Sequence, residues 1–282
     1  MAFDAATYKA TTRQQWQDAA EAWNAWGGFL ATWLGPATEA MLDMAEVEPG
    51  SLVLDVAAGA GQQTLVAAQR VGPSGRVLAT DISPDILDYT MENARIQGLH
   101  NVETLEADGE DLDVVPDNYD AAISRVGLIY FPDQQRALAN IMRALRPGGR
   151  FAAIVYSTPE NNGFFSKPVS IIRDRAQLPP PAAGQPGPFS LGPPGALASV
   201  LEKAGFREIE EKVISAPVAL PTAADCLRFE RESFGALHQM LSSLGSDAQE
   251  AVWAEIGEAL AEFETAEGFK GPCELVVAAG TK

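Results

Sequence analysis

The chain has 282 residues, which is long for a single domain but suits one enlarged α/β domain, and 46% of them are apolar, enough for a sizeable core. With 38 acidic and 20 basic side chains the net charge is −18, and the acids are scattered along the chain. Such a surface repels phosphate backbones and anionic membranes, so we expect a small-molecule ligand and exclude nucleic acid and membrane as partners.

Cysteine content and the N-terminal sequence indicate the compartment. Cys226 and Cys273 lie far apart and have no metal-ligand spacing around them, so we expect two reduced thiols and no metal site. Residues 1–12 lack the charged start and apolar core of a signal sequence, and the chain has no run of about 18 apolar residues. We therefore expect a cytoplasmic protein.

Tryptophans dominate residues 13–34. They recur with a leucine at the spacing of one helical stripe, at Trp16, Trp23, Trp26, Leu30 and Trp33. Gly27-Gly28 predicts two shorter helices in place of one, and Gly35-Pro36 predicts the end of the second, with a further short helix over residues 37–45. The stripe has two interpretations: a helix face packed in the core, which we favour, and an aromatic lid over a ligand.

Strand and helix patterns alternate after residue 50. We expect strands over residues 52–56, 76–80, 102–107, 119–124 and 151–156, with helices over residues 62–70, 84–98 and 138–145 between them. The hydroxyl of Ser83 is expected to cap the second of these helices. Strands joined by helices of this length imply right-handed crossovers and a doubly wound parallel sheet, whose ligand loops lie at the carboxyl ends of the strands.

The alternation lapses after Tyr156. Residues 179–195 hold seven Pro and four Gly, so they are neither regular helix nor sheet, and both a flexible spacer and an ordered loop across a pocket mouth stay open. A helix over residues 196–204 and a sixth strand over 207–216 follow. Two inserted helices, the second with the capping-box pair Ser246 and Gln249, precede a last strand over residues 273–279.

These patterns divide the chain into three parts. Residues 1–45 form an N-terminal helical cap, residues 46–221 and 270–282 form the ligand-binding α/β domain, and residues 222–269 form a helical insertion that covers the substrate site.

Residues 53–65, VLDVAAGAGQQTL, contain the strongest ligand signal. A strand that ends in a glycine loop and turns directly into a helix exposes backbone N–H groups to a ligand. Gly59 and Gly61 open a G-x-G-x-x-T pattern, and Asp81 follows by about the 20 residues expected of an acid that binds a ribose. A nucleotide-like ligand is therefore expected, and a nicotinamide dinucleotide is one option.

Three residues argue against a dinucleotide. Thr64 replaces the third glycine that packs beside a pyrophosphate, and the carboxylate of Asp55 would repel a pyrophosphate but could orient a cationic ligand. Asp108, at the end of the third strand, is placed to accept a hydrogen bond from an exocyclic amine such as adenine N6. The pattern predicts a cationic, adenosyl-like ligand without a diphosphate.

Successive segments resemble the ordered motifs of class I S-adenosylmethionine-dependent methyltransferases. They are VLDVAAGAGQQT, VLATDISPDIL, LEADGEDL, YDAAISRVGLIYFPD and LRPGGRFAAIVYS, and they are most similar to the ubiquinone/menaquinone-biosynthesis type and related small-molecule enzymes. The resemblance covers residues 47–156 strongly, continues weakly over 187–206, and departs where Ala57-Ala58 replaces the usual glycine and cysteine. It implies a Rossmann-like α/β fold with a doubly wound, mostly parallel seven-stranded sheet, N-terminal helices and a helical insertion before the last strand.

The resemblance also implies roles for individual residues, with S-adenosyl-L-methionine as the cofactor and S-adenosyl-L-homocysteine as the product. The methionine part would be held by Asp55 and Thr64 with the backbone at Ala57, Gly59 and Gly61. The ribose and adenine would be held by Asp81, Ile82, Asp108 and Gly109, and Arg125 would lie beside the methionine carboxylate or the acceptor. The alternative for the strand-end acids is that they cap the following turns, and for Arg125 that it pairs with a surface acid.

Methyl transfer from a sulfonium is an in-line displacement, and it needs a base only when the acceptor is protonated. The candidates are Tyr130, which could contact the acceptor, and His238 in the insertion, for which a structural role is the favoured interpretation and a general base the second.

We therefore expect O-, C- or N-methylation of a small acceptor, with an aromatic or quinol-like hydroxyl as one option. A non-catalytic adenosyl-ligand sensor or partner subunit and an NAD-dependent oxidoreductase are the alternatives. The sequence does not predict the oligomeric state.

Overall fold

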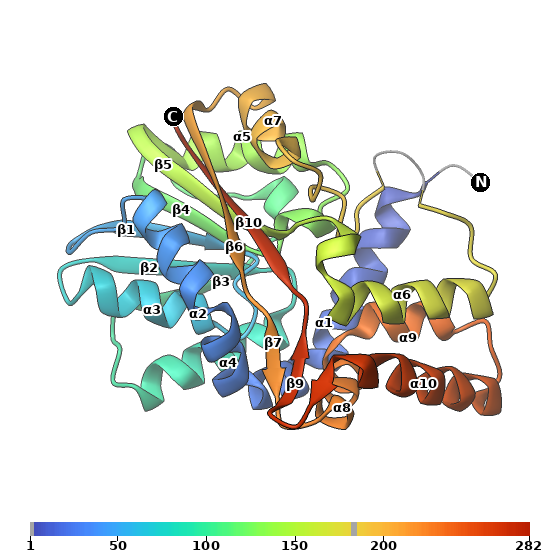
Figure 1. Ribbon diagram of the computed structural model, residues 1–282. Coiled ribbons are helices and arrows are strands. Elements are labelled where there is room, and N and C mark those ends of the chain that lie inside the picture. The colour runs from blue at the N-terminus through green and yellow to red at the C-terminus, as the bar shows by residue number, and fades with distance from the viewer. Residues whose placement is uncertain (1–2, 182–184) are drawn as a thin grey trace.

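The computed structural model describes residues 3–181 and 185–282. Residues 1–2 of the predicted cap and residues 182–184 of the proline-rich stretch lie outside the described residues. A seven-stranded sheet in the order β3-β2-β1-β4-β5-β10-β6 organises the chain (Figure 1). Its strands are β1 (Leu52–Val56), β2 (Arg76–Asp81), β3 (Val102–Glu106), β4 (Tyr119–Arg125), β5 (Leu145–Tyr156), β6 (Arg207–Ser215) and β10 (Glu274–Thr281).

The sheet is parallel from β3 to β5, and β10 runs antiparallel to both β5 and β6. The strand order turns back at β1, whose neighbours are β2 and β4, so the doubly wound, mostly parallel seven-stranded sheet is confirmed. β1 is apolar on both faces because helices cover both faces, and Val53, Leu54 and Val56 are buried.

Helices cover the sheet in two layers. One layer is α2 (Gly27–Met44), α3 (Gln62–Val71) and α4 (Pro84–Ile96), which contact one another in turn, and the other is α5 (Gln134–Ala144) and α7 (Ala196–Lys203) (Figure 1). No helix in the described part of the chain is long and apolar enough to cross a lipid bilayer.

The N-terminal segment breaks where predicted but does not end where predicted. α1 (Ala5–Ala25) and α2 meet at Trp26, beside Gly27. α2 then continues through Gly35 and Pro36 to Met44, so the predicted end at Gly35-Pro36 is wrong. Pro36 removes one helical hydrogen bond, and the burial of the α2 stripe against the sheet outweighs that loss.

Two predicted helix caps are also wrong. The Ser83 hydroxyl makes no capping hydrogen bond; instead the Ser83 N–H donates to Asp81 Oδ1 at 3.0 Å. α10 (Ser246–Leu260) begins after Gly245, and Gln249 Nε2 donates to the carbonyls of Leu241 and Leu244 rather than to a cap. The Ser83 hydroxyl is buried without a hydrogen-bond partner, whereas the Gln249 amide is taken by backbone carbonyls that precede α10.

The predicted insertion contains three helices rather than two. They are α8 (Ala223–Ser233), α9 (Gly235–Leu241) and α10, and they pack with α1 and with α6 (Gly163–Arg175), which the sequence did not predict (Figure 1). A small second sheet of β7 (Val218–Leu220), β8 (Glu264–Thr265) and β9 (Gly268–Gly271) borders them. One turn of 3-10 helix forms at each of η1 (Gly109–Asp111), η2 (Leu128–Tyr130), η3 (Pro159–Asn161) and η4 (Ala261–Phe263).

Candidate active site

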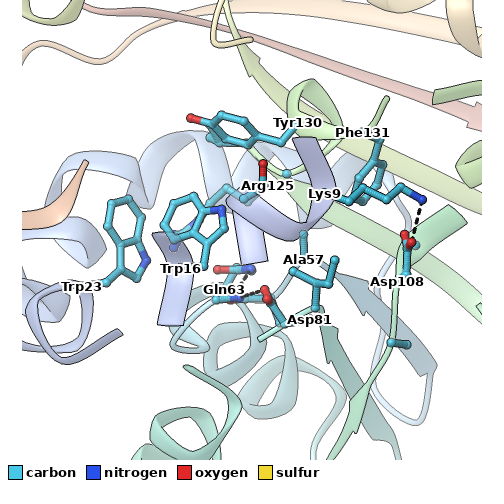
Figure 2. A pocket seen from close by; sticks show the side chains of 18 of the residues that line it. Lys9, Trp16, Trp23, Ala57, Gln63, Asp81, Asp108, Arg125, Tyr130 and Phe131 are labelled. Carbon is cyan, nitrogen blue, oxygen red and sulfur yellow. Dashed lines mark hydrogen bonds and ion pairs between the residues drawn. The ribbon is translucent and has the colours of Figure 1, made fainter. Parts of the chain in front are cut away.

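A cavity lies at the carboxyl ends of the parallel strands, between the sheet and α1 (Figure 2). It contains about 980 Å³ of empty space, with the solvent at its mouth included. The loops after β1 to β4 and the end of β5 line one side, and α1 lines the other with Lys9, Thr12, Trp16 and Trp23. A doubly wound sheet binds its ligands at this edge.

The loop between β1 and α3 places three residues in the left-handed region. Ala57, Gly59 and Gly61 have φ angles of 60°, 59° and 85°. A methyl group on Gly61 would lie 2.7 Å from Thr90 Cγ2, so glycine is required there for contact as well as for conformation. Ala57 adopts the same region without being glycine, so the departure from the family pattern leaves the loop formed but strained.

Asp55 lies beneath the cavity rather than in its wall. Its carboxylate is fully buried and accepts hydrogen bonds from Thr64 Oγ1 at 2.6 Å and Gln63 Nε2 at 3.3 Å. Burial raises the pKa of Asp55 to about 6, against the hydrogen bonds from Thr64 and Gln63 and the charge of Arg125. Neither Asp55 nor Thr64 lines the cavity; Thr64 holds Asp55, and Asp55 holds Gln63, which does line it.

Gln63 and Arg125 present complementary polar groups to the cavity. Gln63 Nε2 is held by Asp55 and by the Ala58 carbonyl at 2.9 Å, whereas its Oε1 is buried and has no hydrogen-bond partner. Arg125 lines the cavity, and its Nη1 donates to Thr38 Oγ1 at 3.2 Å. Burial lowers the pKa of Arg125 to about 10, with the charge of Asp55 opposing, so the guanidinium stays charged at neutral pH.

Asp81 both caps a turn and lines the cavity. Its Oδ2 accepts the N–H of Gly59 and its Oδ1 the N–H of Ser83, both at 3.0 Å, so it ties the glycine loop to the end of β2. It also lines the cavity together with Ile82. Burial raises the pKa of Asp81 above its usual range, while these backbone hydrogen bonds favour the carboxylate.

Asp108 likewise caps a turn and lines the cavity. Its Oδ1 accepts the N–H of Glu110 at 2.9 Å, and its Oδ2 lies 2.6 Å from Lys9 Nζ. Gly109 beside it faces Phe131, since a methyl group on Gly109 would lie 2.7 Å from Phe131 Cζ. This ring packs directly on Gly109, so the position next to Asp108 has no room for a larger side chain.

Aromatic side chains form the opposite end of the cavity. Trp16 packs edge to face against Trp23 and Tyr130, with ring centroids 5.4 and 6.0 Å apart (Figure 2). Tyr156 and Phe234 also line the cavity. Burial raises the pKa of both Tyr130 and Tyr156, so both phenols stay protonated at neutral pH.

The tryptophans of the predicted stripe differ in their surroundings. Trp33 is buried against the sheet and donates from Nε1 to the Ala216 carbonyl at 2.7 Å, whereas Trp16 and Trp23 face the cavity. The described residues of the proline-rich segment do not line the cavity. Phe189 in its described part packs on Tyr156, with centroids 6.3 Å apart, behind the wall that Tyr156 forms.

Of the predicted site residues, eight line the cavity: Ala57, Gly59, Asp81, Ile82, Asp108, Gly109, Arg125 and Tyr130. Asp55, Gly61 and Thr64 support it from behind. His238 lies elsewhere, because its Nε2 is 2.6 Å from the Arg231 carbonyl oxygen and its ring packs on Trp253, so the structure does not bring it to the site.

Sequence reasoning missed Lys9, Gln63, Tyr156 and Phe234. Gln63 belongs to the quoted loop motif. An amide side chain in the first turn of the helix that follows the glycine loop is the signal that could have identified it. The others come from α1, the end of β5 and the start of α9, and only the packing of these elements brings them to one cavity.

Comparisons with known proteins agree with this geometry. Residues 37–170 match the model of the ubiE/COQ5 methyltransferase family. An uncharacterized protein of Mycobacterium tuberculosis is 34% identical over 154 residues, 53% of this chain and 54% of that one. Nocamycin O-methyltransferase of Saccharothrix syringae is 31% identical over 185 residues, 62% of this chain and 66% of that one.

The chain thus spans about half the length of its mycobacterial relative. Among solved structures, the cyclase SpnF superposes with a TM-score of 0.56 at 18% identity, over 94% of this chain and 96% of that one. Similarity at this level of identity shows the shared fold alone.

Proposed function

We propose that this chain, whose residues 37–170 belong to the class I S-adenosylmethionine-dependent methyltransferases, moves a methyl group from S-adenosylmethionine to a small-molecule acceptor and leaves S-adenosylhomocysteine. The observation that carries the proposal is the pairing of Gln63 and Arg125 in the wall of the cavity. Gln63 offers an unpartnered acceptor and Arg125 a charged donor, which together suit the ammonium and carboxylate of an amino acid end.

The other end of the cavity suits an adenosine. Asp81 beside Ile82 fits ribose hydroxyls, and Asp108, which lines the cavity near Phe131, fits the amino edge of a purine. Two acids, Asp81 and Asp108, balance the cations Lys9 and Arg125 in the lining, so the cavity has no excess of positive charge to hold the diphosphate of a dinucleotide. Bound there, S-adenosylmethionine would supply a methyl group that its sulfonium already activates.

The chain's own contribution is to bind, orient and exclude water. Trp16, Trp23 and Tyr130 present ring faces and edges at the aromatic end, where they suit a positive charge and a flat apolar acceptor. Because Tyr130 is protonated at neutral pH, it would donate a hydrogen bond to an acceptor oxygen rather than remove a proton. Positioning then supplies most of the rate, and His238 takes no part.

Charge and thiol chemistry support a small acceptor in the cytoplasm. A net charge of −18 disfavours nucleic acid as the acceptor, and the buried cysteines Cys226 and Cys273 are unpaired, as suits a reducing compartment.

Methyl transfer is tested with S-adenosylmethionine that carries a labelled methyl group and a panel of phenols, quinols, amines and thiols. We expect one acceptor class to gain the label, with S-adenosylhomocysteine formed in equal amount. Replacement of Tyr130 by Phe should lower turnover of a hydroxyl acceptor by about tenfold or more while ligand binding is retained. Binding of S-adenosylhomocysteine without labelled product from any acceptor would favour a sensor or partner subunit, and tighter binding of NAD would favour an oxidoreductase.

A further inference from the structure

Lys9 of α1 joins the two acidic side chains at the proposed adenine end of the cavity. Its Nζ lies 2.6 Å from Asp108 Oδ2 and 2.6 Å from Glu110 Oε2 (Figure 2 shows the contact with Asp108). The Lys9 and Asp108 side chains are 25% and 27% exposed, and that of Glu110 only 5%. Burial alone lowers the pKa of Lys9, but the hydrogen bonds with Asp108 and Glu110 outweigh it, and the net shift is upward. Lys9 is therefore firmly cationic.

The two carboxylates are fixed independently of Lys9. Asp108 Oδ1 accepts the N–H of Glu110 at 2.9 Å, and Glu110 Oε1 accepts the N–H of Asp133 at 2.8 Å. Each carboxylate thus uses one oxygen to hold the backbone and gives the other to Lys9. If the ammonium withdraws from Asp108, Oδ2 keeps its place and becomes an acceptor that faces the cavity.

We propose that Lys9 competes with the amino group of the adenine ring for Asp108 Oδ2, and that this lysine thereby sets both the affinity for the adenosyl ligand and the preference for a 6-amino over a 6-oxo purine. The inference rests on the proposed function. Lys9 keeps one ionic partner when it leaves Asp108, because Glu110 is nearly buried and retains the ammonium while the adenine amine donates to Asp108. A 6-oxo purine offers an acceptor at that position, so it cannot replace Lys9 at Asp108 but can accept a hydrogen bond from it.

Arg13 supplies a matched control on the same helix. Its Nη2 lies 2.5 Å from Glu106 Oε1 in an exposed ion pair that ties α1 to the end of β3, and it does not line the cavity. Lys9→Met and Arg13→Met each remove one cation that links α1 to this region, but only Lys9→Met frees Asp108. Lys9→Arg keeps a cation between the two acids.

The experiment measures the affinity of the full chain and its variants for S-adenosylhomocysteine and for S-inosylhomocysteine, followed by tryptophan fluorescence because Trp16 and Trp23 line the cavity. We expect Lys9→Met to bind the adenosyl ligand about fivefold more tightly, the effect of a partly sheltered ion pair. The inosyl ligand should gain nothing, so the preference for the adenosyl ligand rises by at least about fivefold. Lys9→Arg and Arg13→Met should stay within about twofold of the unmodified chain for both ligands.

Unchanged or weaker binding of S-adenosylhomocysteine by Lys9→Met would overturn the inference, as would an equal gain for both ligands or an equal gain in Arg13→Met, which would indicate a general loosening of α1. Thermal unfolding of each variant verifies that it is folded. If the unmodified chain binds no S-adenosylhomocysteine, the proposed function fails and the inference with it. If it binds and Lys9→Met changes nothing, the inference alone fails.

Discussion

Gly127 in the loop after β4 lies so close to Ala57 in the loop after β1 that a larger side chain in one loop requires a change in the other. A methyl group added to Gly127 would lie 2.4 Å from Ala57 Cβ and 3.1 Å from Ser124 Oγ. The two residues come from the loops after β4 and β1, and both line the cavity. Close packing of these two loops thus shapes the site, and it depends on the small size of Gly127 and Ala57.

This contact predicts a rescue. Gly127→Ala should destabilise the protein by about 1–3 kcal/mol through overpacking, and the double variant Ala57→Gly with Gly127→Ala should recover most of that loss because the clashing methyl group is gone. Ala57→Gly alone should change stability by less than about 1 kcal/mol, since relief of the left-handed strain offsets the greater freedom of the unfolded chain. Urea unfolding of the four proteins measures this, and a double variant no more stable than Gly127→Ala would contradict it.

Single residues also show how far sequence reasoning reaches. Asp81 and Asp108 were predicted from their place at strand ends, because the carboxyl ends of parallel strands meet at one edge of a sheet, whereas Arg125 was predicted from the family resemblance. Which polar side chain reaches the cavity could not be predicted. Asp55, for example, lies behind Gln63 rather than in the cavity wall. Which of two neighbouring polar side chains faces a cavity depends on rotamers and packing, which the order of residues does not state.

Among the elements, local sequence predicted the sheet better than the covering helices. The strands and α3 to α5 have strong periodicity and turn residues at their ends, and they form nearly where predicted. α2 runs through Pro36, and α6 contains Pro168 and begins at Gly163, so local rules argued against both. Their stability comes from burial of Leu34, Met41, Phe164 and Phe165 in the tertiary structure.

α8 carries an acid that makes its packing sensitive to pH. Glu230 is fully buried, its Oε2 has no hydrogen-bond partner, and its Oε1 faces Cys226 Sγ at 3.9 Å. Burial raises the pKa of Glu230 well above its usual range, with the Cys226 contact opposing, so the folded protein holds this carboxyl group protonated. The unfolded chain releases the proton above pH about 4.5.

Since the folded state binds the extra proton, its stability falls as the pH rises above the unfolded pKa of Glu230 and toward the folded one. Glu230→Gln removes this proton and keeps the shape, so the variant should gain on the unmodified protein as the pH rises from 5 toward the folded pKa of Glu230, by up to about 1.4 kcal/mol for each pH unit. Chemical unfolding of the two proteins at these pH values gives the difference. A constant difference would contradict the assignment of a neutral, buried Glu230.

At the scale of the whole molecule, the cavity belongs to no single segment. Its lining runs from Lys9 to Phe234, and α8 and α9 pack with α1 beside it (Figure 1). The sheet explains why an adenosyl ligand is expected, whereas α1 and the inserted helices shape the part of the cavity that we propose for the acceptor. The predicted division into a cap, a sheet domain and an insertion remains a prediction, because α1 and α8–α10 pack together rather than as separate covers.

Isothermal titration of the full chain with S-adenosylhomocysteine tests the central claim most directly. One ligand should bind each chain, with a negative heat-capacity change because the ligand enters a largely apolar cavity, and NAD should bind more weakly. At about 100-fold excess over the dissociation constant, the ligand should also raise the free energy of unfolding by about 2.7 kcal/mol. The absence of binding, or tighter binding of NAD than of S-adenosylhomocysteine, would contradict the account.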